Sequence, residues 1–362
     1  MRIFSIDIYK YSLPLTRPLV IHGQKIDKRE GLILSLNKQG LGEIAPLPGL
    51  SLETLKEAHK QLESIRSFLL AENIPSGVEK LNGRLQEWLE TFQLKPSVQF
   101  GIEMAILNLI SYSKNTAMNK IISHEHHDHV RINALLQGSI DDVRTQAKNF
   151  VEQGFTALKL KVGSHVRSNI HEDIAKVSAV NEAIEGKALL HVDANQSWTL
   201  KDALQFGNEV GCAAVDYVEE PFKNLEDISE FFYGTTIPVA LDESLRTHSL
   251  REVKSISGVE IVVLKPTIIG GLEKTWAMIH EAHSYALEAV VSSSFESSLG
   301  ISAIGNLAGS FSRDHTAGLD TLKWFSQDLL KKKITVSHGK MDVGQMNMGE
   351  SNVDFSLLTK VG

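Results

Sequence analysis

Two lysines stand two residues apart in a short apolar run, Ala157-Leu158-Lys159-Leu160-Lys161-Val162-Gly163. If the run is a strand, Lys159 and Lys161 point to the same face, because side chains alternate along a strand. Two positive charges on the inner face of a buried strand are costly unless opposite charge lies nearby. The lysine pair therefore predicts carboxylates close to it in the fold.

Charged residues also stand at the ends of later apolar runs. Asp193, Glu219 and Asp242 each close one predicted strand, and Lys265 closes the next. Consecutive strands of a parallel barrel are neighbours, so these side chains would meet at one mouth. Three carboxylates that converge there would repel one another unless a cation lies between them. Oxygen ligands favour Mg²⁺, for which Mn²⁺ can substitute.

Two further acids follow these carboxylates directly, and strand alternation separates their roles. Glu219 shares a face with Tyr217, and Pro221 ends that strand, so Glu219 is predicted to be the inward metal ligand. Glu220 and Glu243 are predicted to support the metal ligands from outside.

The lysines would flank the carboxylates on two sides. Lys159 and Lys161 precede the acids and Lys265 follows them, so a small-molecule carboxylate substrate would bind between two positively charged walls. This arrangement suits removal of a proton α to the carboxylate, because positive charge stabilises the enediolate that forms. The alternative is that the charges form structural salt bridges. Their ordered placement at strand ends favours a reactive site.

The elements that would position these residues alternate between strand and helix patterns. Short apolar runs recur at 131–136, 157–162, 188–193, 214–219, 239–242, 259–265, 289–292 and 318–320. Helical patterns lie between them, which indicates βα units and a parallel sheet. Eight such strands predict an α/β fold, a closed TIM-type barrel with its active site at the carboxyl ends of the strands.

The chain outside this pattern predicts a second, smaller domain. Residues 1–98 are typical of an α+β unit, with strands from Ile3 to Tyr11 and at 31–36, a polar loop at 16–29 and helices to about residue 93. The barrel domain is predicted at 99–324. The tail, 325–362, is predicted to return to the first domain.

Composition argues against some classes of partner. Of the 362 residues, 42% are hydrophobic and 22% are charged, and the formal net charge is -7. A negatively charged chain gives no reason to expect nucleic acid or an anionic membrane as partner.

The single cysteine, Cys212, excludes an intramolecular disulfide framework and predicts a packed core thiol in a reducing compartment. No apolar run approaches the length of a membrane span, so we expect a cytoplasmic protein. The sequence leaves its oligomeric state open.

These residues resemble the enolase superfamily, in its muconate-lactonising subgroup. The shared motifs are Lys159-Leu160-Lys161, Asp193-Ala194-Asn195, Glu219-Glu220-Pro221, Asp242-Glu243-Ser244 and Lys265-Pro266. Within the subgroup the chain looks most similar to the o-succinylbenzoate synthase family, through segments at 42–49, 96–101, 263–267, 292–300 and 318–321. The resemblance implies a modified TIM barrel of the (β/α)7β type, with an α+β capping domain built from the N-terminal region and the C-terminal tail.

The resemblance also implies a reaction and a division of roles. The family removes water from 2-succinyl-6-hydroxy-2,4-cyclohexadiene-1-carboxylate in a syn elimination, which gives o-succinylbenzoate for menaquinone synthesis. By that likeness Lys161 removes the α-proton and, as its conjugate acid, assists departure of the hydroxyl from the same face. Lys265 steadies the enediolate by charge, Lys159 orients the substrate, and Mg²⁺ is bound by Asp193, Glu219 and Asp242. The implied substrate-binding residues are Asn195, Ser292, Ser293, Ser294 and Arg29.

Two other functions fit the same residues. Racemisation or epimerisation of N-acylamino acids or dipeptides would use Lys161 and Lys265 as bases on opposite faces. Dipeptide epimerases of this subgroup tend to carry a second acid two residues after the acid of the last strand, whereas Asp320 is followed by Thr321 and Leu322. A non-catalytic barrel that binds a small acid is the alternative from another class. Retention of all three acids and all three lysines argues against it.

A histidine-rich segment at 124–129, His-Glu-His-His-Asp-His, falls outside this scheme. Four imidazoles in six residues could bind a transition metal. Their spacing matches no closed zinc site, so a solvated loop before the next strand is the simpler interpretation.

Overall fold

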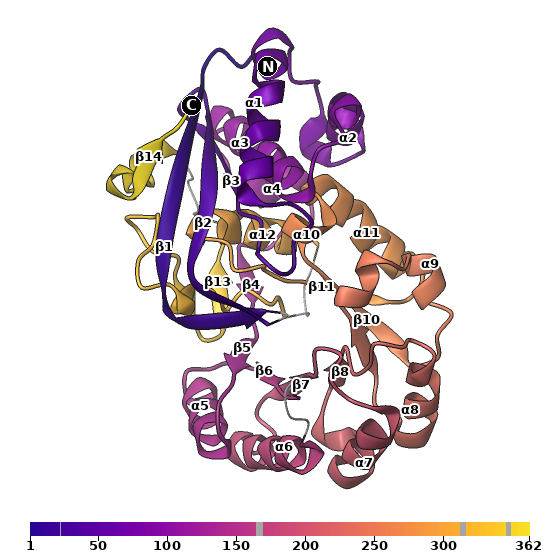
Figure 1. Ribbon diagram of the computed structural model, residues 1–362. Coiled ribbons are helices and arrows are strands. Elements are labelled where there is room, and N and C mark those ends of the chain that lie inside the picture. The colour runs from indigo at the N-terminus through magenta and orange to yellow at the C-terminus, as the bar shows by residue number, and fades with distance from the viewer. Residues whose placement is uncertain (22, 164–168, 312–315, 345–348) are drawn as a thin grey trace.

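Figure 1 shows the computed structural model, which describes residues 1–21, 23–163, 169–311, 316–344 and 349–362. His22, from the predicted polar loop, lies outside the described residues. An antiparallel sheet has the strand order β14-β1-β2-β3. Its strands are β1 (Ile6–Ile21), β2 (Gln24–Leu36), β3 (Gly40–Ile44) and β14 (Leu358–Lys360).

A parallel sheet of seven strands in the described residues carries the predicted site, in the order β11-β10-β9-β8-β7-β6-β5. The strands are β5 (Ala134–Leu136), β6 (Ala157–Lys161), β7 (Leu189–Asp193), β8 (Tyr217–Glu219), β9 (Val239–Leu241), β10 (Val259–Leu264) and β11 (Glu288–Val291). Sequential strands are spatial neighbours and helices lie between them, which confirms the α/β prediction of a parallel sheet built from βα units.

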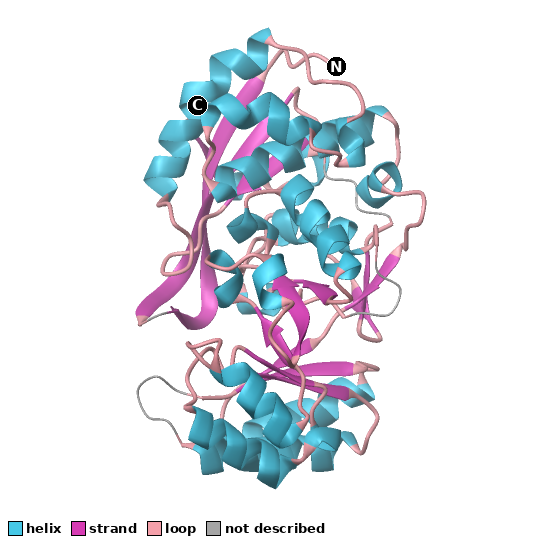
Figure 2. Ribbon diagram, turned by 90° about the vertical axis from the view of Figure 1, so that its right-hand side faces the viewer, coloured by secondary structure: helices cyan, strands magenta, loops and turns pink. Residues whose placement is uncertain are grey.

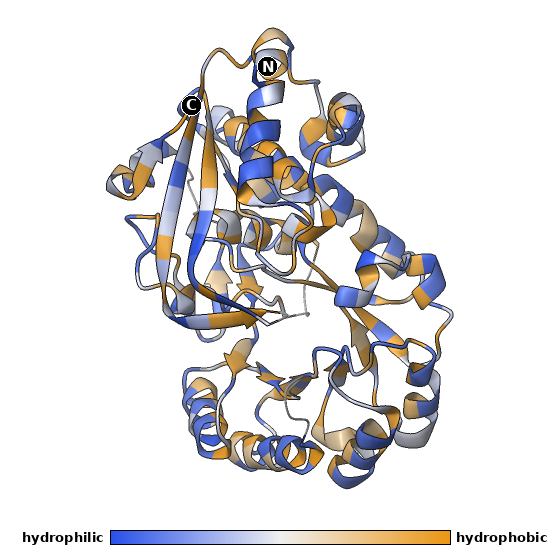
Figure 3. Ribbon diagram, in the orientation of Figure 1, coloured by the Kyte–Doolittle hydropathy of each residue, from blue (hydrophilic) through white to orange (hydrophobic). Residues whose placement is uncertain are grey.

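The two faces of this curved sheet pack differently. Val262 and Leu264 of β10 join the large core toward the helices. A small separate cluster lies on the inner face: Tyr217, Ala240, Ile261, Val263 and Val290. Because residues alternate along a strand, the inner face that carries Tyr217 also carries Glu219. The helices around the sheet carry both hydrophilic and hydrophobic residues, as expected for helices with one face on a core (Figure 3).

Residues 317–318 join the two edges of the parallel sheet. Ala317 bridges to Ile132, just before β5, and Gly318 bridges to Ser292, just after β11. The N–H of Gly318 donates to the carbonyl of Val291 at 2.9 Å. The predicted strand at 318–320 therefore takes the form of isolated bridges, and these link the first and last strands of the curved sheet.

The predicted strand at 131–136 is split between two sheets. β4 (His129–Arg131) pairs with β13 (Lys340–Asp342), which pairs with β12 (Val336–Ser337). β5 begins only at Ala134. The chain changes partners at Asn133, whose N–H donates to the carbonyl of Ala317. A run of apolar residues cannot by itself show that a strand changes sheets.

The polar loop predicted at 16–29 is wrong, because the two first strands form one long hairpin. β1 and β2 pair antiparallel from Ile6 with Leu36 to Ile21 with Gln24, with a register shift between Pro14 and Leu19. Figure 1 shows the hairpin extending from the antiparallel sheet toward the parallel one. Its outer part is rich in charged residues, so it lacks the apolar alternation that marks a half-buried strand.

Helix α3 (Pro96–Ser113) packs against the antiparallel sheet, and almost all of it is buried. A Cβ on Gly42 of β3 would stand only 1.8 Å from the carbonyl oxygen of Gly101, so both glycines permit the close approach. The predicted boundary between residues 98 and 99 therefore falls inside a helix.

The other helices follow the chain. They are α1 (Leu55–Ala71), α2 (Arg84–Leu89), α4 (Met118–Ile122), α5 (Ile140–Glu152), α6 (Ile170–Ile184), α7 (Leu200–Val210), α8 (Asp227–Thr235), α9 (Leu250–Val253), α10 (Pro266–Ile269), α11 (Leu272–Ser284) and α12 (Ser298–Ala308). Figure 2 shows one group of helices beside the antiparallel sheet and another around the parallel strands. Among the helices of the described ranges, none is long and apolar enough to cross a membrane.

The tail and the cysteine show where local patterns mislead. β14 pairs with β1, but β13 pairs with β4 beside the parallel sheet, so the tail contacts both parts of the molecule. Cys212 is exposed, and the prediction of a core thiol is wrong. It lies in a short 3-10 turn, Cys212–Ala214, which connects α7 to β8 at the surface.

Candidate active site

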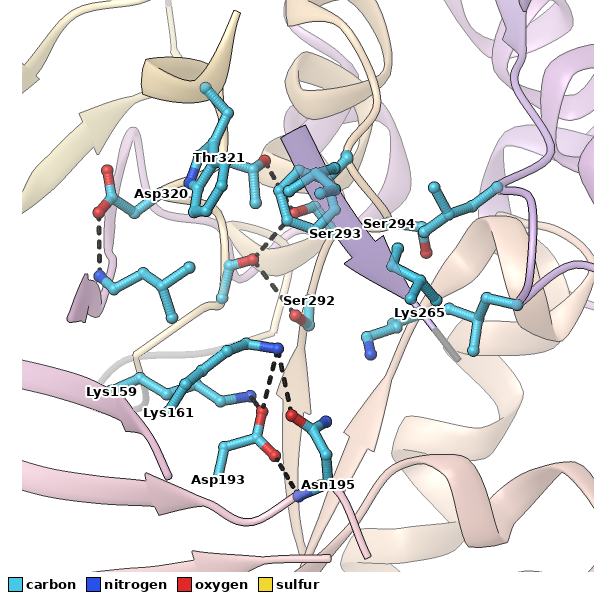
Figure 4. A pocket seen from close by; sticks show the side chains of 18 of the residues that line it. Lys159, Lys161, Asp193, Asn195, Lys265, Ser292, Ser293, Ser294, Asp320 and Thr321 are labelled. Carbon is cyan, nitrogen blue, oxygen red and sulfur yellow. Dashed lines mark hydrogen bonds and ion pairs between the residues drawn. The ribbon is translucent and has the colours of Figure 1, made fainter. Parts of the chain in front are cut away.

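A cavity of about 400 Å³ lies at the carboxyl ends of the parallel strands. Its polar wall includes Lys159, Lys161, Asp193, Asn195, Glu243, Lys265 and the serines 292–294. Figure 4 shows Lys159 and Lys161 on one side of the cavity and Lys265 on the other. The strand ends thus bring the predicted lysines of β6 and the lysine after β10 to opposite walls of one space.

Sheet register explains why these residues meet. Lys161 of β6 pairs with Asp193 of β7, and Asp193 pairs with Glu219 of β8. The three side chains therefore form a row across neighbouring strands at the same height, as strand-end placement in a parallel barrel predicts. Asp242 follows β9, and Lys265 follows β10.

Lys159 is the buried member of the lysine pair. Its Nζ lies 2.7 Å from Oε1 of Glu219 and 3.0 Å from Oδ2 of Asp193, and 13% of its side chain is exposed. Burial alone would lower the pKa of this ammonium, but the charges of Asp193 and Glu219 outweigh burial and raise the pKa well above its usual value. Lys159 is therefore a fixed positive charge.

Lys161 is the accessible member of the pair. Its Nζ lies 3.3 Å from Oδ1 of Asn195 and 3.8 Å from Oδ2 of Asp193. Its side chain is 39% exposed, against 13% for Lys159 and 16% for Lys265. Of the three lysines, Lys161 can therefore approach a bound molecule with the least displacement of its partners.

Lys265 supplies the opposite wall. It forms a close ion pair with Asp242, and both side chains are largely buried. Burial would lower the pKa of Lys265, but Asp242 and Glu243 outweigh it and raise the pKa above its usual value. Asp242 and Lys265 thus mirror the pairing of Asp193 with Lys159 on the other side.

The carboxylates of the site outnumber the lysines. Burial would raise the pKa of Asp193, but Lys159 and Lys161 outweigh it and lower the pKa to about 2. Burial raises the pKa of Glu219 to about 7, and the neighbouring acids Asp193 and Asp242 add to the rise against the charge of Lys159. Burial and the charge of Asp242 raise the pKa of Glu243 to about 8. Four carboxyl groups therefore meet three ammonium groups at this mouth, and the protonated forms of Glu219 and Glu243 are favoured unless further positive charge lies near them.

The donors at this mouth are of the chemical type that suits a divalent cation, but in this structure they are paired with lysines. Carboxylate oxygens are the ligands that Mg²⁺ prefers, and Oε2 of Glu243 is buried without a hydrogen-bond partner. Across the described ranges, no three histidine, cysteine, aspartate or glutamate side chains are grouped so that they could hold an ion. At this mouth the ammonium groups of Lys159 and Lys265 lie against the carboxylates.

Glu220 differs from its neighbour Glu219 in what it contacts. Its Oε1 accepts the N–H groups of Asp242 and Ser244 at 2.7 and 2.8 Å. Its Oε2 accepts the Ser244 hydroxyl and the Gln196 amide, each at 2.8 Å. All four contacts hold the turns after β7 and β9, so Glu220 positions the backbone that carries Asp242. Glu243 instead lines the cavity and accepts from the Asn195 amide at 3.2 Å.

The serines at 292–294 line the cavity between the two lysine walls. The hydroxyls of Ser292 and Ser293 each donate to the carbonyl of Gly318 at 3.2 Å, and Ser293 also contacts the Thr321 hydroxyl at 3.0 Å. The Ser294 hydroxyl is buried without a hydrogen-bond partner. A polar group of a bound molecule can supply that partner.

Arg29 does not reach the cavity, which contradicts its predicted contact with substrate. It is 1% exposed, and it is not among the residues that line the cavity. Its guanidinium donates to the carbonyls of Ala45, Pro46 and Phe295. The misassigned polar loop had suggested a solvent-facing residue, whereas Arg29 points into the contact between the two sheets.

An apolar wall of the cavity was not predicted. It includes Leu19 and Ile21 of the hairpin, Leu47 and Leu50 of the turn after β3, and Trp324. Leu19, Leu47, Leu50 and Trp324 belong to one buried cluster. Its only sequence signal is the apolar run at 19–21, inside a stretch that otherwise reads as polar.

Two other predicted features lie apart from this chemistry. Asp320 lines the cavity, but its Oδ2 accepts the N–H of Leu135 and pairs with Lys323. In the histidine-rich segment, which lies within the described residues, no three side chains are close enough together to hold a metal ion. His126 instead contacts the carbonyl of His124, and Asp128 pairs with Lys120.

Two family models match the chain. Residues 142–349 match the model described as "Enolase C-terminal domain-like", and residues 3–109 match "MenC, N-terminal domain". Solved structures share the fold at low identity. The L-Ala-D/L-Glu epimerase of Bacillus subtilis has a TM-score of 0.83 at 22% identity, with 98% of this chain and 100% of that chain covered. A muconate lactonizing enzyme of Pseudomonas fluorescens has a TM-score of 0.85 at 18% identity, with 98% of each chain covered.

Curated relatives are closer in sequence. The o-succinylbenzoate synthase of Aliivibrio fischeri is 32% identical over 89% of this chain and 91% of its own length. That of Haemophilus influenzae is 34% identical over 90% of this chain and 92% of its own length. The protein PHYLLO of Arabidopsis thaliana is 30% identical over 85% of this chain, which spans only 20% of PHYLLO. The chain therefore belongs to the o-succinylbenzoate synthase family of the enolase superfamily.

Proposed function

We propose that this protein is an o-succinylbenzoate synthase, a hydro-lyase that removes water from 2-succinyl-6-hydroxy-2,4-cyclohexadiene-1-carboxylate in menaquinone biosynthesis. The observation that carries the proposal is the pair of lysine walls across one cavity, in a chain of this family. A substrate carboxylate bound between them has a base on one face and a fixed positive charge on the other.

Lys161 is the proposed base. As the neutral amine it accepts the α-proton, and the electron pair of the broken C–H bond enters the conjugated carboxylate. The lysine then returns that proton to the departing hydroxyl on the same face, so water leaves and the ring becomes aromatic. The accessibility of Lys161 supports this role, since its side chain is 39% exposed at the cavity.

Lys265 and Lys159 are the proposed fixed charges. Both are largely buried and paired with carboxylates, which holds them in place and raises their pKa values. A charge that is already oriented lowers the energy of the developing enediolate without reorganising during the reaction. Asn195, which accepts from Lys161, would orient the base.

We infer that Mg²⁺ is held by Asp193, Glu219 and Asp242. The excess of carboxylates and the unpartnered oxygen of Glu243 support this assignment. When bound, the ion supplies positive charge that favours the enediolate form of the substrate carboxylate. The same charge favours the neutral amine form of a nearby lysine.

The remaining surfaces fit a two-part substrate. The unpartnered Ser294 hydroxyl and the turn around it support binding of the polar succinyl chain. The ring would lie against the apolar wall of Leu19, Leu50 and Trp324. On this proposal the N-terminal region, with the antiparallel sheet and helix α3, acts together with β14 of the tail as the capping domain of the barrel. The expected binding partner is then the small-molecule carboxylate substrate.

The single cysteine fits a reducing compartment, which supports a cytoplasmic location.

Racemisation of an N-succinylamino acid is the second candidate, because Lys161 and Lys265 face each other across the cavity. The test is a pair of assays with purified protein and Mg²⁺. One follows formation of o-succinylbenzoate from the cyclohexadiene substrate, and the other follows loss of optical activity from an N-succinylamino acid. Dehydration at the higher kcat/KM is the expected result. Racemisation without dehydration would replace the proposal with the second candidate.

A further inference from the structure

The serine turn of the cavity is held from behind by the antiparallel sheet. Arg29 on β2 donates through Nε to the carbonyl of Phe295 at 3.0 Å. Its Nη2 donates to Ala45 at 2.8 Å and its Nη1 to Pro46 at 3.0 Å, both in the segment that follows β3. One side chain therefore ties the turn after β11 to the turn that carries Leu47 and Leu50 of the apolar wall.

Each of these contacts is made inside the protein. Arg29 is 1% exposed, so its charge has been removed from water at a substantial cost. The planar guanidinium offsets part of that cost, because it donates hydrogen bonds in three fixed directions to three carbonyls from two segments. A shorter or single-headed cation could not reach all three.

Phe295, whose carbonyl accepts from Arg29, has an unfavourable backbone conformation. Its φ is 58°, in the left-handed region that bulky residues rarely adopt. Such a conformation costs of the order of 1–3 kcal/mol and persists where its surroundings hold it. Phe295 lines the cavity directly after Ser294, so a change at its carbonyl would also move the serine turn.

Glu43 holds the other end of the same turn. From β3 its carboxylate accepts the N–H and the hydroxyl of Ser297 at 2.9 and 2.7 Å, and the N–H of Gly300 at 2.7 Å. Tyr11 of β1 also donates its hydroxyl to this carboxylate. Arg29 and Glu43 thus fix the carbonyl of Phe295 and the amide of Ser297 from two neighbouring strands.

We propose that Arg29 and Glu43 are positioning residues that set substrate affinity by fixing the turn from Ser292 to Ser297, without touching the substrate. The inference rests on the proposed function, because it assigns the succinyl group to that turn. It predicts that loss of the arginine acts mainly on KM, since the lysines and carboxylates lie on other strands.

Arg29→Met and Arg29→Lys are compared with the control Arg66→Met. Arg66 on α1 also donates to a backbone carbonyl of the antiparallel sheet, that of Ile6 at 2.8 Å, but it does not line the cavity. In Arg29→Met we expect KM to rise on the order of tenfold, with a smaller change in kcat. Arg29→Lys should give an intermediate KM, because lysine keeps the positive charge but cannot donate to all three carbonyls. Arg66→Met should lower the melting temperature and leave KM unchanged.

Amide hydrogen exchange of peptides covering 292–297 tests the inference independently of turnover. Arg29→Met should exchange faster there than the wild type, and Arg66→Met should not. Wild-type exchange in Arg29→Met, a wild-type KM in Arg29→Met or Arg29→Lys, or an equal KM change in Arg66→Met would each overturn the positioning role. An inactive wild type would overturn the proposed function instead, and the exchange comparison would still decide whether Arg29 fixes the turn.

Discussion

Lys159 and Lys161 are two residues apart on β6 and point to the same face, yet their surroundings differ. Lys159 is clamped by Asp193 and Glu219, whereas Lys161 contacts Asn195 and lies more open to the cavity. The difference arises from height along the strand, because Lys161 is nearer the carboxyl end where the mouth opens. At the residue scale, one lysine is suited to hold charge and the other to move a proton.

Asp242→Ala tests the metal assignment at this scale. Loss of one of the three proposed carboxylate ligands should weaken Mg²⁺ binding by at least about tenfold, measured by titration calorimetry. Asp320→Asn is the matched control, since Asp320 lines the same cavity but is engaged with Leu135 and Lys323. Unchanged Mg²⁺ affinity in Asp242→Ala, or an equal loss in both variants, would argue against this ligand set.

Lys265→Met tests the opposite wall. The variant removes a fixed charge that is held beside Asp242, so kcat for dehydration should fall by at least about a hundredfold while the protein stays folded. Circular dichroism checks the fold and steady-state kinetics the rate. Near-normal kcat would mean that charge on this wall does not stabilise the transition state.

The turns that follow the strands connect these residues into a site. Asn195, two residues after the end of β7, and Glu220, directly after β8, have positive φ values of 44° and 43°. The four hydrogen bonds of Glu220 hold the two turns against each other, and its burial, with Asp242 close by, raises its pKa. At the element scale, the position of Asp242 therefore depends on a residue that is not itself in the cavity.

Glu220→Gln tests this dependence. The amide keeps the size of the side chain but turns one acceptor into a donor that faces the donors of Ser244 or Gln196. We expect kcat to fall by about 10- to 100-fold with a parallel loss of Mg²⁺ affinity, as for other groups that orient metal ligands. Ser244→Ala removes one of the four bonds and should have a smaller effect. Wild-type kinetics in Glu220→Gln would show that the turns hold without it.

Buried carboxylates also tie the two parts of the molecule together. Glu103 of α3 accepts the N–H of Glu273 in the first turn of α11 at 2.9 Å. The carboxylate of Glu273 in turn accepts the N–H groups of Gly83 and Gln86 at the start of α2. At the scale of the whole molecule, the antiparallel and parallel parts are thus linked in series, because Glu103 of α3 caps α11 and Glu273 of α11 caps α2.

This linkage predicts a pH dependence of stability. Burial raises the pKa of Glu103 to about 7 from a usual value of 4.5. Since the folded-state pKa is the higher one, the folded protein should lose stability as the pH rises through this window, by about 3 kcal/mol in total. Glu103→Gln removes that loss, so thermal unfolding of the variant should depend less on pH between 4.5 and 7. Glu87→Gln, at an exposed acid of α2, is the control. Identical pH profiles for wild type and Glu103→Gln would contradict the assignment.

Features that depend on neighbouring residues in the sequence could be predicted, whereas contacts between residues far apart in the sequence could not. The lysine and carboxylate set was accessible because strand alternation and strand ends are local patterns, and Lys161, Asp193 and Glu219 meet through simple register. The contacts of Arg29 were not, since its carbonyl partners lie 16, 17 and 266 residues away and backbone carbonyls leave no side-chain signature. The full length of the hairpin was missed because the outer ends of its two strands are rich in polar and charged residues.

The rate of o-succinylbenzoate formation by Lys161→Ala, beside the wild type, tests the central claim most directly. Both proteins are supplied with Mg²⁺ and the cyclohexadiene substrate, and product is followed by its absorbance. The account predicts rapid dehydration by the wild type and a loss of at least about a thousandfold in the variant, with unchanged circular dichroism. A folded Lys161→Ala that dehydrates the substrate at the wild-type rate would contradict it.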